Sequence, residues 1–261
     1  MGKITNALQK AAEDRLNRMD KIAKIKETKQ LIVRKEGISN IDPRIVTYYD
    51  TKALISEQYK ILRTNLMSLG TKKKIKTVVV TSSIHSEGKT VSSLNLAISL
   101  AQAVNNPKVL VVDCDLRRGR LAKYLGIKNE IGFSEYLKGE AQLSDIIFKI
   151  DIENLNIISA GKVPENPSEL LSSKAMTEFL SEVKTQFDFI IIDTPPIISV
   201  TDSGIIGAQT DGVLMVIQAG RTQRGIVRRA EELLEQAQAN VLGHILTNIQ
   251  YHLPEYIYRY L

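Results

Sequence analysis

The chain has 261 residues, of which 43% are hydrophobic and 25% charged, and its formal net charge is +6. This composition is typical of one large soluble domain, or of a domain with an arm, and the positive charge suits an acidic partner without choosing one. No apolar run approaches the roughly 18 to 20 residues of a membrane span, the N-terminus lacks the apolar centre of a signal peptide, and the single cysteine, Cys114, excludes an internal disulfide, so we expect a cytoplasmic protein.

The first fifty residues are predicted to form an arm and a linker. Within the first forty, ten Lys or Arg stand against five Asp or Glu. An amphipathic helix that docks on a partner or on a membrane surface is one interpretation, and a marginal helix beside a disordered linker is the other. The stretch 27–49 has weak periodicity and contains Pro43, so we interpret it as linker. The apolar residues that recur at helical spacing in the arm are Ile4, Leu8, Ala11, Ala12, Leu16, Met19 and Ala23.

From residue 51 the sequence alternates between helical and apolar strand patterns. A helix over about 54–69 comes first, and short runs rich in Val and Ile then alternate with helical segments, which predicts βαβ units. The predicted fold is α/β, with a mostly parallel central sheet, helices on both faces, and ligands at the carboxyl ends of the strands. We expect this domain over 51–250 and a tail over 251–261. The expected strands are 76–81, 108–113, 155–159, 189–193, 212–218 and 241–248.

The segment TSSIHSEGKT, residues 81–90, joins the first of these strands to a helix, as a phosphate-binding loop does. It fits GxxxxGK[ST] except at Ser83, where the first glycine belongs. Its backbone N–H groups would surround the phosphates, Lys89 would reach the β and γ oxygens, and Thr90 would ligate Mg²⁺. The alternative is a Ser-rich turn with a stray lysine. We therefore predict a P-loop NTPase that binds ATP and Mg²⁺, with nucleotide contacts from Ser86, Glu87, Gly88, Lys89, Thr90 and Val91.

Two further strands end in carboxylates at the edge where the loop is expected. Asp113 and Asp115 end one strand at i, i+2 spacing, and Asp193 ends another. Phosphoryl transfer needs a metal held by hydroxyl and acidic groups, cations on the γ-phosphate and a base for the nucleophile. Aspartates at strand ends also serve as helix caps or turn formers, which is the alternative for each motif alone.

These motifs resemble those of the bacterial tyrosine kinases of the exopolysaccharide type, in their stand-alone cytoplasmic form. That family has a Walker A loop, an Asp-x-Asp-x-Arg motif and a Walker B strand, which fall here at 83–90, 113–117 and 190–193. Residues 159–171 are also similar to the family's Gly-x-x-Pro-x-Asn-Pro-x-Glu-Leu-Leu stretch.

The resemblance implies roles for individual residues. Asp113 would activate the attacking tyrosine, and Lys89 would neutralise the transferring phosphate. The implied catalytic residues are Lys89, Asp113 and Asp115; the implied metal ligands are Thr90, Asp115 and Asp193; and the implied additional nucleotide contacts are Arg117 and Asn248.

The C-terminus carries four of the nine tyrosines within its last eleven residues. The resemblance implies that such a tail is phosphorylated in trans, and we expect Tyr256, Tyr258 and Tyr260 as acceptors. An aromatic terminal element that packs on the sheet is the alternative, with Tyr251 in the core.

Glu57, Lys60 and Arg63 share one face of the first helix and are similar to the family's Glu-x-x-Arg-x-x-Arg ring motif. They are our candidates for contacts in a homo-oligomeric ring. Lys60 replaces an arginine and lacks its bidentate fork, which would weaken such a ring, and a solvated charged face is the alternative.

The resemblance implies an ATP-dependent tyrosine autokinase that regulates exopolysaccharide synthesis and export. Its implied activator is an inner-membrane polysaccharide co-polymerase, which would place the protein at the periphery of the inner membrane. We expect no nucleic-acid partner, because the basic segments carry no stacking aromatics. One alternative is a positioning ATPase, whose signature lysine would stand where this chain has Ile84. The other is a non-catalytic, nucleotide-dependent regulator.

Overall fold

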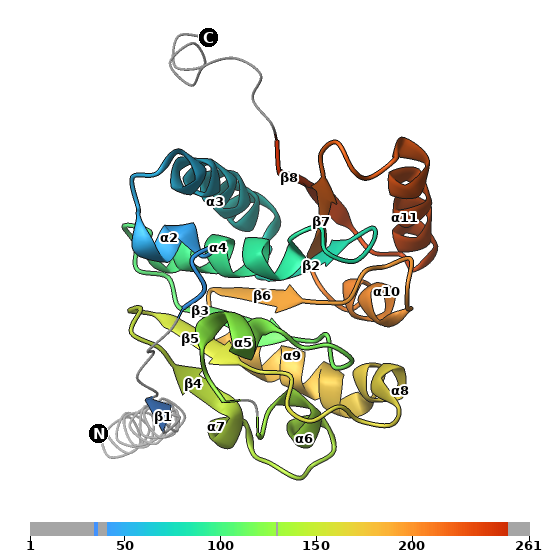
Figure 1. Ribbon diagram of the computed structural model, residues 1–261. Helices are drawn as coiled ribbons and strands as arrows, with labels where there is room; N and C mark the ends of the chain where they lie inside the picture. Colours follow the sequence, from blue (N-terminus) through green and yellow to red (C-terminus); the bar gives the residue numbers. More distant parts are fainter. Residues whose placement is uncertain (1–33, 36–40, 129, 250–261) are drawn as a thin grey trace, which may run out of the picture. The chain divides into compact units, whose positions relative to one another are not determined.

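The computed structural model describes residues 34–35, 41–128 and 130–249 (Figure 1). By its internal contacts the chain divides into two units, 1–32 and 33–261, and the described residues belong to the second. The predicted amphipathic arm, whose apolar positions run from Ile4 to Ala23, and the predicted acceptors Tyr256, Tyr258 and Tyr260 lie outside the described residues.

The described part of the chain contains one eight-stranded sheet of order β1-β4-β5-β3-β6-β2-β7-β8. Neighbouring strands are parallel except β4 and β5. This confirms the predicted α/β fold with a mostly parallel sheet. The strands are β1 (Arg34–Lys35), β2 (Thr77–Ser82), β3 (Val109–Asp113), β4 (Ile147–Lys149), β5 (Leu155–Ile158), β6 (Phe189–Asp193), β7 (Gly212–Gln218) and β8 (Val241–Thr247).

Helices cover both faces of this sheet, as predicted (Figure 1). Helices α2, α3 and α4 pack together on one face, and α9 and α10 pack on the other. Among the described residues, no helix is both long and apolar enough to cross a membrane. The helices are α2 (Val46–Tyr49), α3 (Leu54–Lys73), α4 (Lys89–Ala101), α5 (Leu121–Leu125), α6 (Phe133–Leu137), α7 (Leu143–Ile146), α8 (Pro167–Leu171), α9 (Lys174–Gln186), α10 (Asp202–Gly207) and α11 (Arg224–Gln236).

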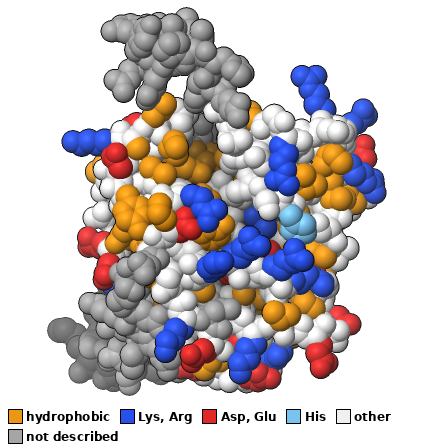
Figure 2. All heavy atoms as spheres, in the orientation of Figure 1, with side chains coloured by type: hydrophobic (Ala, Val, Ile, Leu, Met, Phe, Trp, Pro, Cys, Tyr) orange, Lys and Arg blue, Asp and Glu red, His pale blue; other side chains and the backbone are white. Residues whose placement is uncertain are grey.

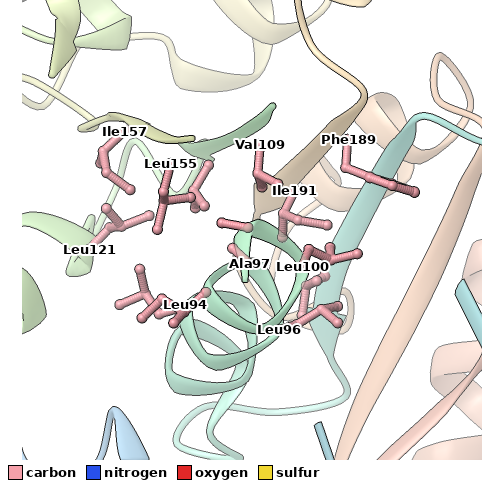
Figure 3. Close-up of a cluster of buried hydrophobic side chains, with 14 of the residues drawn as sticks. Leu94, Leu96, Ala97, Leu100, Val109, Leu121, Leu155, Ile157, Phe189 and Ile191 are labelled. Carbon is pink, nitrogen blue, oxygen red and sulfur yellow. The ribbon is translucent and has the colours of Figure 1, made fainter. Parts of the chain in front are cut away.

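Helix α4 lies at the centre of the core and is buried almost all round, because it is enclosed between the sheet and α3. Its side chains at Leu94, Ala97 and Leu100 pack against Ile191 of β6 and Leu155 of β5 (Figure 3). Each buried leucine of this kind contributes about 1.5 to 3 kcal/mol. This packing fixes the N-terminus of α4 at the carboxyl edge of the sheet.

The predicted linker over 27–49 is corrected at its C-terminal end. Ile41 and Ile45 are buried in the core, and the backbone N–H of Thr47 donates to Oδ1 of the buried Asn95 at 3.0 Å. The domain therefore begins by Ile41 and not at residue 51. Helix α2 has four residues, too few to give a periodic signal, and it is held by tertiary contacts that no local pattern shows.

Candidate active site

The predicted phosphate-binding loop follows β2 and ends where α4 begins at Lys89. Ser86 and Gly88 have positive φ angles of 66° and 92°. Left-handed residues within such a loop turn successive N–H groups toward a common point, and the helix terminus adds a partial positive charge there. The loop is therefore built to bind an anion.

Ser83, at the first glycine position of the motif, is fully buried. Its hydroxyl lies 4.0 Å from the sulfur of Met215 in β7. The side chain thus packs toward the sheet, so the loop tolerates a serine there.

The three sequence motifs meet at the carboxyl edge of the sheet. The Lys89 ammonium lies 3.0 Å from Asp115 Oδ2 and 3.7 Å from Asp193 Oδ2. The Thr90 hydroxyl donates to Asp193 Oδ2 at 2.7 Å, and the Ser93 hydroxyl donates to Asp193 Oδ1 at 3.1 Å. Segments about 100 residues apart in the sequence therefore supply one cluster of a lysine, a threonine and two carboxylates.

Asp113 adds a third carboxylate to this cluster. It is only 1% exposed and accepts N–H donors from Asp115 at 3.1 Å and Leu121 at 3.0 Å. Burial, followed by repulsion from Asp193, raises the pKa of Asp113 to about 7. A carboxylate with such a pKa can exchange protons near neutral pH.

Lys89 is the counter-charge of the cluster. Burial alone would lower its pKa, but Asp193, Asp115 and Asp113 together raise it. Burial also raises the pKa of Asp193, against the opposing effects of Lys89 and the Thr90 hydrogen bond. Lys89 therefore stays charged, and its positive charge offsets only part of the cost of burying the carboxylates around it.

The oxygen donors of this cluster fit Mg²⁺. Thr90 Oγ1 is hydrogen-bonded to the Asp193 carboxylate, and the Asp115 carboxylate forms an ion pair with the neighbouring Lys89. Within the described residues no group of three or more His, Cys, Asp or Glu side chains forms a complete metal cage. Mg²⁺ typically takes one or two carboxylates and fills its remaining positions with phosphate oxygens and waters, so a partial donor set suits it.

A pocket opens over the loop and this cluster. It is lined by His85, Ser86, Gly88, Lys89, Thr90, Val91, Asp115, Arg118, Arg120 and Tyr124. The sequence predicts six nucleotide-binding residues in the loop, and five of them line this pocket. Arg118, Arg120 and Tyr124 also line the pocket and were not predicted from the sequence, although both arginines belong to the basic run LRRGR, which begins within the second motif.

Glu87 is the sixth of these predicted loop residues, and it does not line the pocket. Its buried carboxylate accepts the backbone N–H of Ile84 at 2.8 Å, the N–H of Gln218 at 3.2 Å and the Thr222 hydroxyl. Its carbonyl accepts the Thr247 hydroxyl at 2.7 Å. Glu87 therefore braces the loop against β7 and β8, and its contribution to nucleotide binding stays a prediction.

Arg117 and Asn248 are not among the residues that line the pocket. The Arg117 guanidinium donates to the buried Asp202 at 2.9 Å and to the Ser168 hydroxyl at 2.8 Å. Asn248 follows β8 with a φ angle of 54°. Their roles at a nucleotide stay untested predictions, and for Arg117 the ion pair with Asp202 argues against such a role.

The predicted oligomer residues lie on α3. Lys60 pairs with Glu57 at 2.7 Å, and both are exposed or half-buried. Arg63 instead donates to the carbonyl of Ser99 in α4 at 2.8 Å. Within this chain, Arg63 thus ties α3 to the core helix.

Comparison with known proteins agrees with this geometry. The AAA domain family matches residues 75–241. The tyrosine-protein kinase YwqD of Bacillus subtilis is 33% identical over 216 residues, which cover 83% of this chain and 90% of that protein. The tyrosine-protein kinase CpsD of Streptococcus agalactiae is 38% identical over 77% of this chain and 86% of its own length. The kinase domain of the Escherichia coli tyrosine kinase ETK superposes with a TM-score of 0.74 at 30% identity, covering 80% of this chain and 83% of that one.

Proposed function

Because this chain belongs to the family of bacterial tyrosine-protein kinases, we propose that it transfers the γ-phosphoryl group of ATP to tyrosines in its own C-terminal tail. The observation that carries this proposal is the placement of Lys89 between the carboxylates of Asp115 and Asp193. This brings the loop and both acidic motifs into one cluster of contacts, as phosphoryl transfer requires.

In this reaction the loop N–H groups and Lys89 bind the phosphates. The tyrosine oxygen forms a bond to the γ-phosphorus, the bond from that phosphorus to the β–γ bridging oxygen breaks, and ADP leaves. Asp113 accepts the tyrosine proton, since a base with a pKa of about 7 is half deprotonated near neutral pH.

Thr90, Asp115 and Asp193 would hold Mg²⁺, which supplies positive charge to the phosphate oxygens. Their oxygen atoms are the hard donors that this ion prefers. Removing Mg²⁺ with a chelator should abolish transfer, since the ion would supply positive charge that Lys89, already paired with Asp115 and Asp193, does not.

The finer parts of the proposal rest on the resemblance of the motifs. The tail acceptors are Tyr256, Tyr258 and Tyr260, and they are phosphorylated in trans within a ring that uses the Glu57–Lys60 face of α3. An inner-membrane polysaccharide co-polymerase activates the enzyme, holds it at the periphery of the membrane and links it to exopolysaccharide synthesis and export.

The test is incubation of the purified full chain with Mg-ATP, followed by mapping of phosphate by mass spectrometry. Phosphotyrosine in the tail is expected, and it should be lost both in Lys89→Met and in a chain truncated after Ile249. Lys138→Met, which removes an exposed lysine far from the loop in sequence, is the matched control and should behave as the unmodified chain. Release of inorganic phosphate without labelled tyrosine would instead indicate a positioning ATPase, and tight nucleotide retention without turnover would indicate a regulator.

A further inference from the structure

Arg118 and Arg120 line the pocket without acidic partners. Both are exposed, and within residues 41–128 and 130–249 neither guanidinium makes an ion pair or a side-chain hydrogen bond. Lys89 is held by Asp115 and Asp193, and Arg117 is held by Asp202. The uncommitted positive charge at the pocket therefore comes from these two arginines. Figure 2 shows Lys and Arg side chains gathered across the centre of one face of the molecule.

The backbone that carries the two arginines is fixed to the catalytic carboxylates. The N–H of Arg118 donates to Asp115 Oδ1 at 3.0 Å, and the N–H of Leu121 donates to Asp113 Oδ2 at 3.0 Å. Gly119 between them leaves no space, since a Cβ there would come within 2.4 Å of the Ala160 side chain. The two guanidinium groups are therefore carried by a backbone segment that is hydrogen-bonded to Asp115 and to the proposed base, Asp113.

This placement favours a role toward the acceptor. The phosphates are served from the loop side by backbone N–H groups and Lys89, whereas the arginines come from the segment that supplies Asp113 and Asp115. A tyrosine hydroxyl that reaches Asp113 must bring its neighbouring residues close to that segment. Uncompensated cations there attract an acidic neighbour and repel a basic one.

We propose that Arg118 and Arg120 select acceptor tyrosines that follow an acidic residue, so that the tail is phosphorylated first at Tyr256. This inference rests on the proposed kinase function. Glu255 directly precedes Tyr256 and is the only acidic residue in 251–261, whereas Arg259 lies between Tyr258 and Tyr260. The ligand of the two arginines is therefore the carboxylate of an acidic peptide segment.

The expected size of the effect follows from exposed ion pairs. One such pair changes a rate or an affinity by up to about fivefold, and two arginines on one carboxylate by up to about tenfold. The selection is thus a preference among tyrosines of one chain and is measured as a ratio of sites.

The experiment measures initial phosphorylation rates at each tail tyrosine by mass spectrometry in the full chain with Mg-ATP. In the unmodified chain Tyr256 should be the fastest site. The double variant Arg118→Ala/Arg120→Ala should lower the ratio of Tyr256 to the two later sites by roughly five- to tenfold, and Glu255→Lys should do the same. Combining Arg118→Glu and Arg120→Glu with Glu255→Lys should restore the preference for Tyr256. Arg228→Ala, an exposed arginine on α11, is the matched control and should leave the ratio unchanged.

The outcomes separate this inference from the function on which it rests. No phosphotyrosine in the unmodified chain would overturn both. An active chain whose site ratio is the same in the double-alanine variant would overturn the selection alone. Equal slowing of all sites together with a raised KM for ATP would assign the arginines to the nucleotide and also overturn it.

Discussion

Asp113 and Asp193 lie directly opposite each other at the carboxyl ends of the adjacent parallel strands β3 and β6. Both carboxyl groups are buried, at 1% and 0% exposure, and the ion pairs of Lys89 within the described part of the chain are with Asp193 and Asp115. Two neighbouring buried carboxylates raise each other's cost of ionisation. The folded site therefore resists ionisation of both carboxyl groups, and the positive charge of a bound magnesium ion would favour it.

The first prediction concerns the pH dependence of stability in the nucleotide-free protein. The pKa of Asp113 is 3.8 in the unfolded chain and about 7 in the folded chain. Between these values the folded state binds a proton that the unfolded state releases, so the free energy of unfolding falls as pH rises from about 4 to about 7, by a few kcal/mol. Urea unfolding at several pH values should show a flatter profile for Asp113→Asn over this window. Asp151→Asn, at an exposed aspartate, should keep the original profile, and equal profiles for all three proteins would contradict the prediction.

The second prediction concerns the brace of the loop. Glu87→Ala leaves the donors on Ile84, Gln218 and Thr222 without their buried acceptor. We expect a loss of about 2 to 4 kcal/mol in the free energy of unfolding and weaker ATP binding, measured by denaturant unfolding and by calorimetry. Glu140→Ala, at an exposed glutamate, is the control. Full stability in Glu87→Ala would show that the brace has no energetic role.

Glu87 also shows where the sequence stops being informative. The motif places it correctly within the loop, but the direction of its side chain depends on Gln218, which is 131 residues away. The continuous Val and Ile runs of β3, β6 and β7 predicted those strands well, because strands buried on both faces are apolar throughout. The three-residue β4 was missed because it is too short for any periodic signal.

The same limit applies to the arginines after the second motif. The resemblance of the motif implies that Arg117 contacts the nucleotide, whereas in the structure its guanidinium donates to Asp202, and Arg118 and Arg120 line the pocket. The partner that holds Arg117 away from the pocket, Asp202, lies 85 residues further along the chain, so no local pattern shows which of the three arginines faces the pocket. The carboxylates Asp113 and Asp193 were predictable, because the carboxyl ends of parallel strands share one edge.

The third prediction follows from this ion pair. Arg117→Ala removes the cation from a fully buried Asp202, while Arg117 itself is 38% exposed. We expect a loss of about 1 to 3 kcal/mol in the free energy of unfolding and less than about a twofold change in the Kd for ATP. Thermal unfolding and calorimetry check both values, with Arg228→Ala as the exposed control. A large rise in the Kd for ATP at unchanged stability would instead place Arg117 at the nucleotide.

The fourth prediction compares the two hydroxyls that donate to Asp193. Thr90 lines the pocket and Ser93 does not, although both reach the same carboxylate. Thr90→Val should raise the Mg²⁺ concentration needed for nucleotide binding by about tenfold or more, since it would remove the proposed metal ligand as well as a hydrogen bond. Ser93→Ala removes a hydrogen bond alone and should leave the Mg²⁺ requirement nearly unchanged. Titration of Mg²⁺ at fixed nucleotide, followed by fluorescence of a labelled nucleotide, distinguishes them, and similar curves for both variants would argue against Thr90 as a ligand.

Strand β8 is the last strand at one edge of the sheet, and its final residue, Thr247, donates to the carbonyl of Glu87. Fraying of an edge strand costs less free energy than opening a central one, and here it also withdraws a donor from the nucleotide loop. The two events are thermodynamically reciprocal. A ligand that stabilises the loop must therefore slow amide hydrogen exchange along β8. Conversely, tension on the chain beyond Ile249 that frays β8 must weaken the binding of that ligand, and the coupling free energy is the same in both directions.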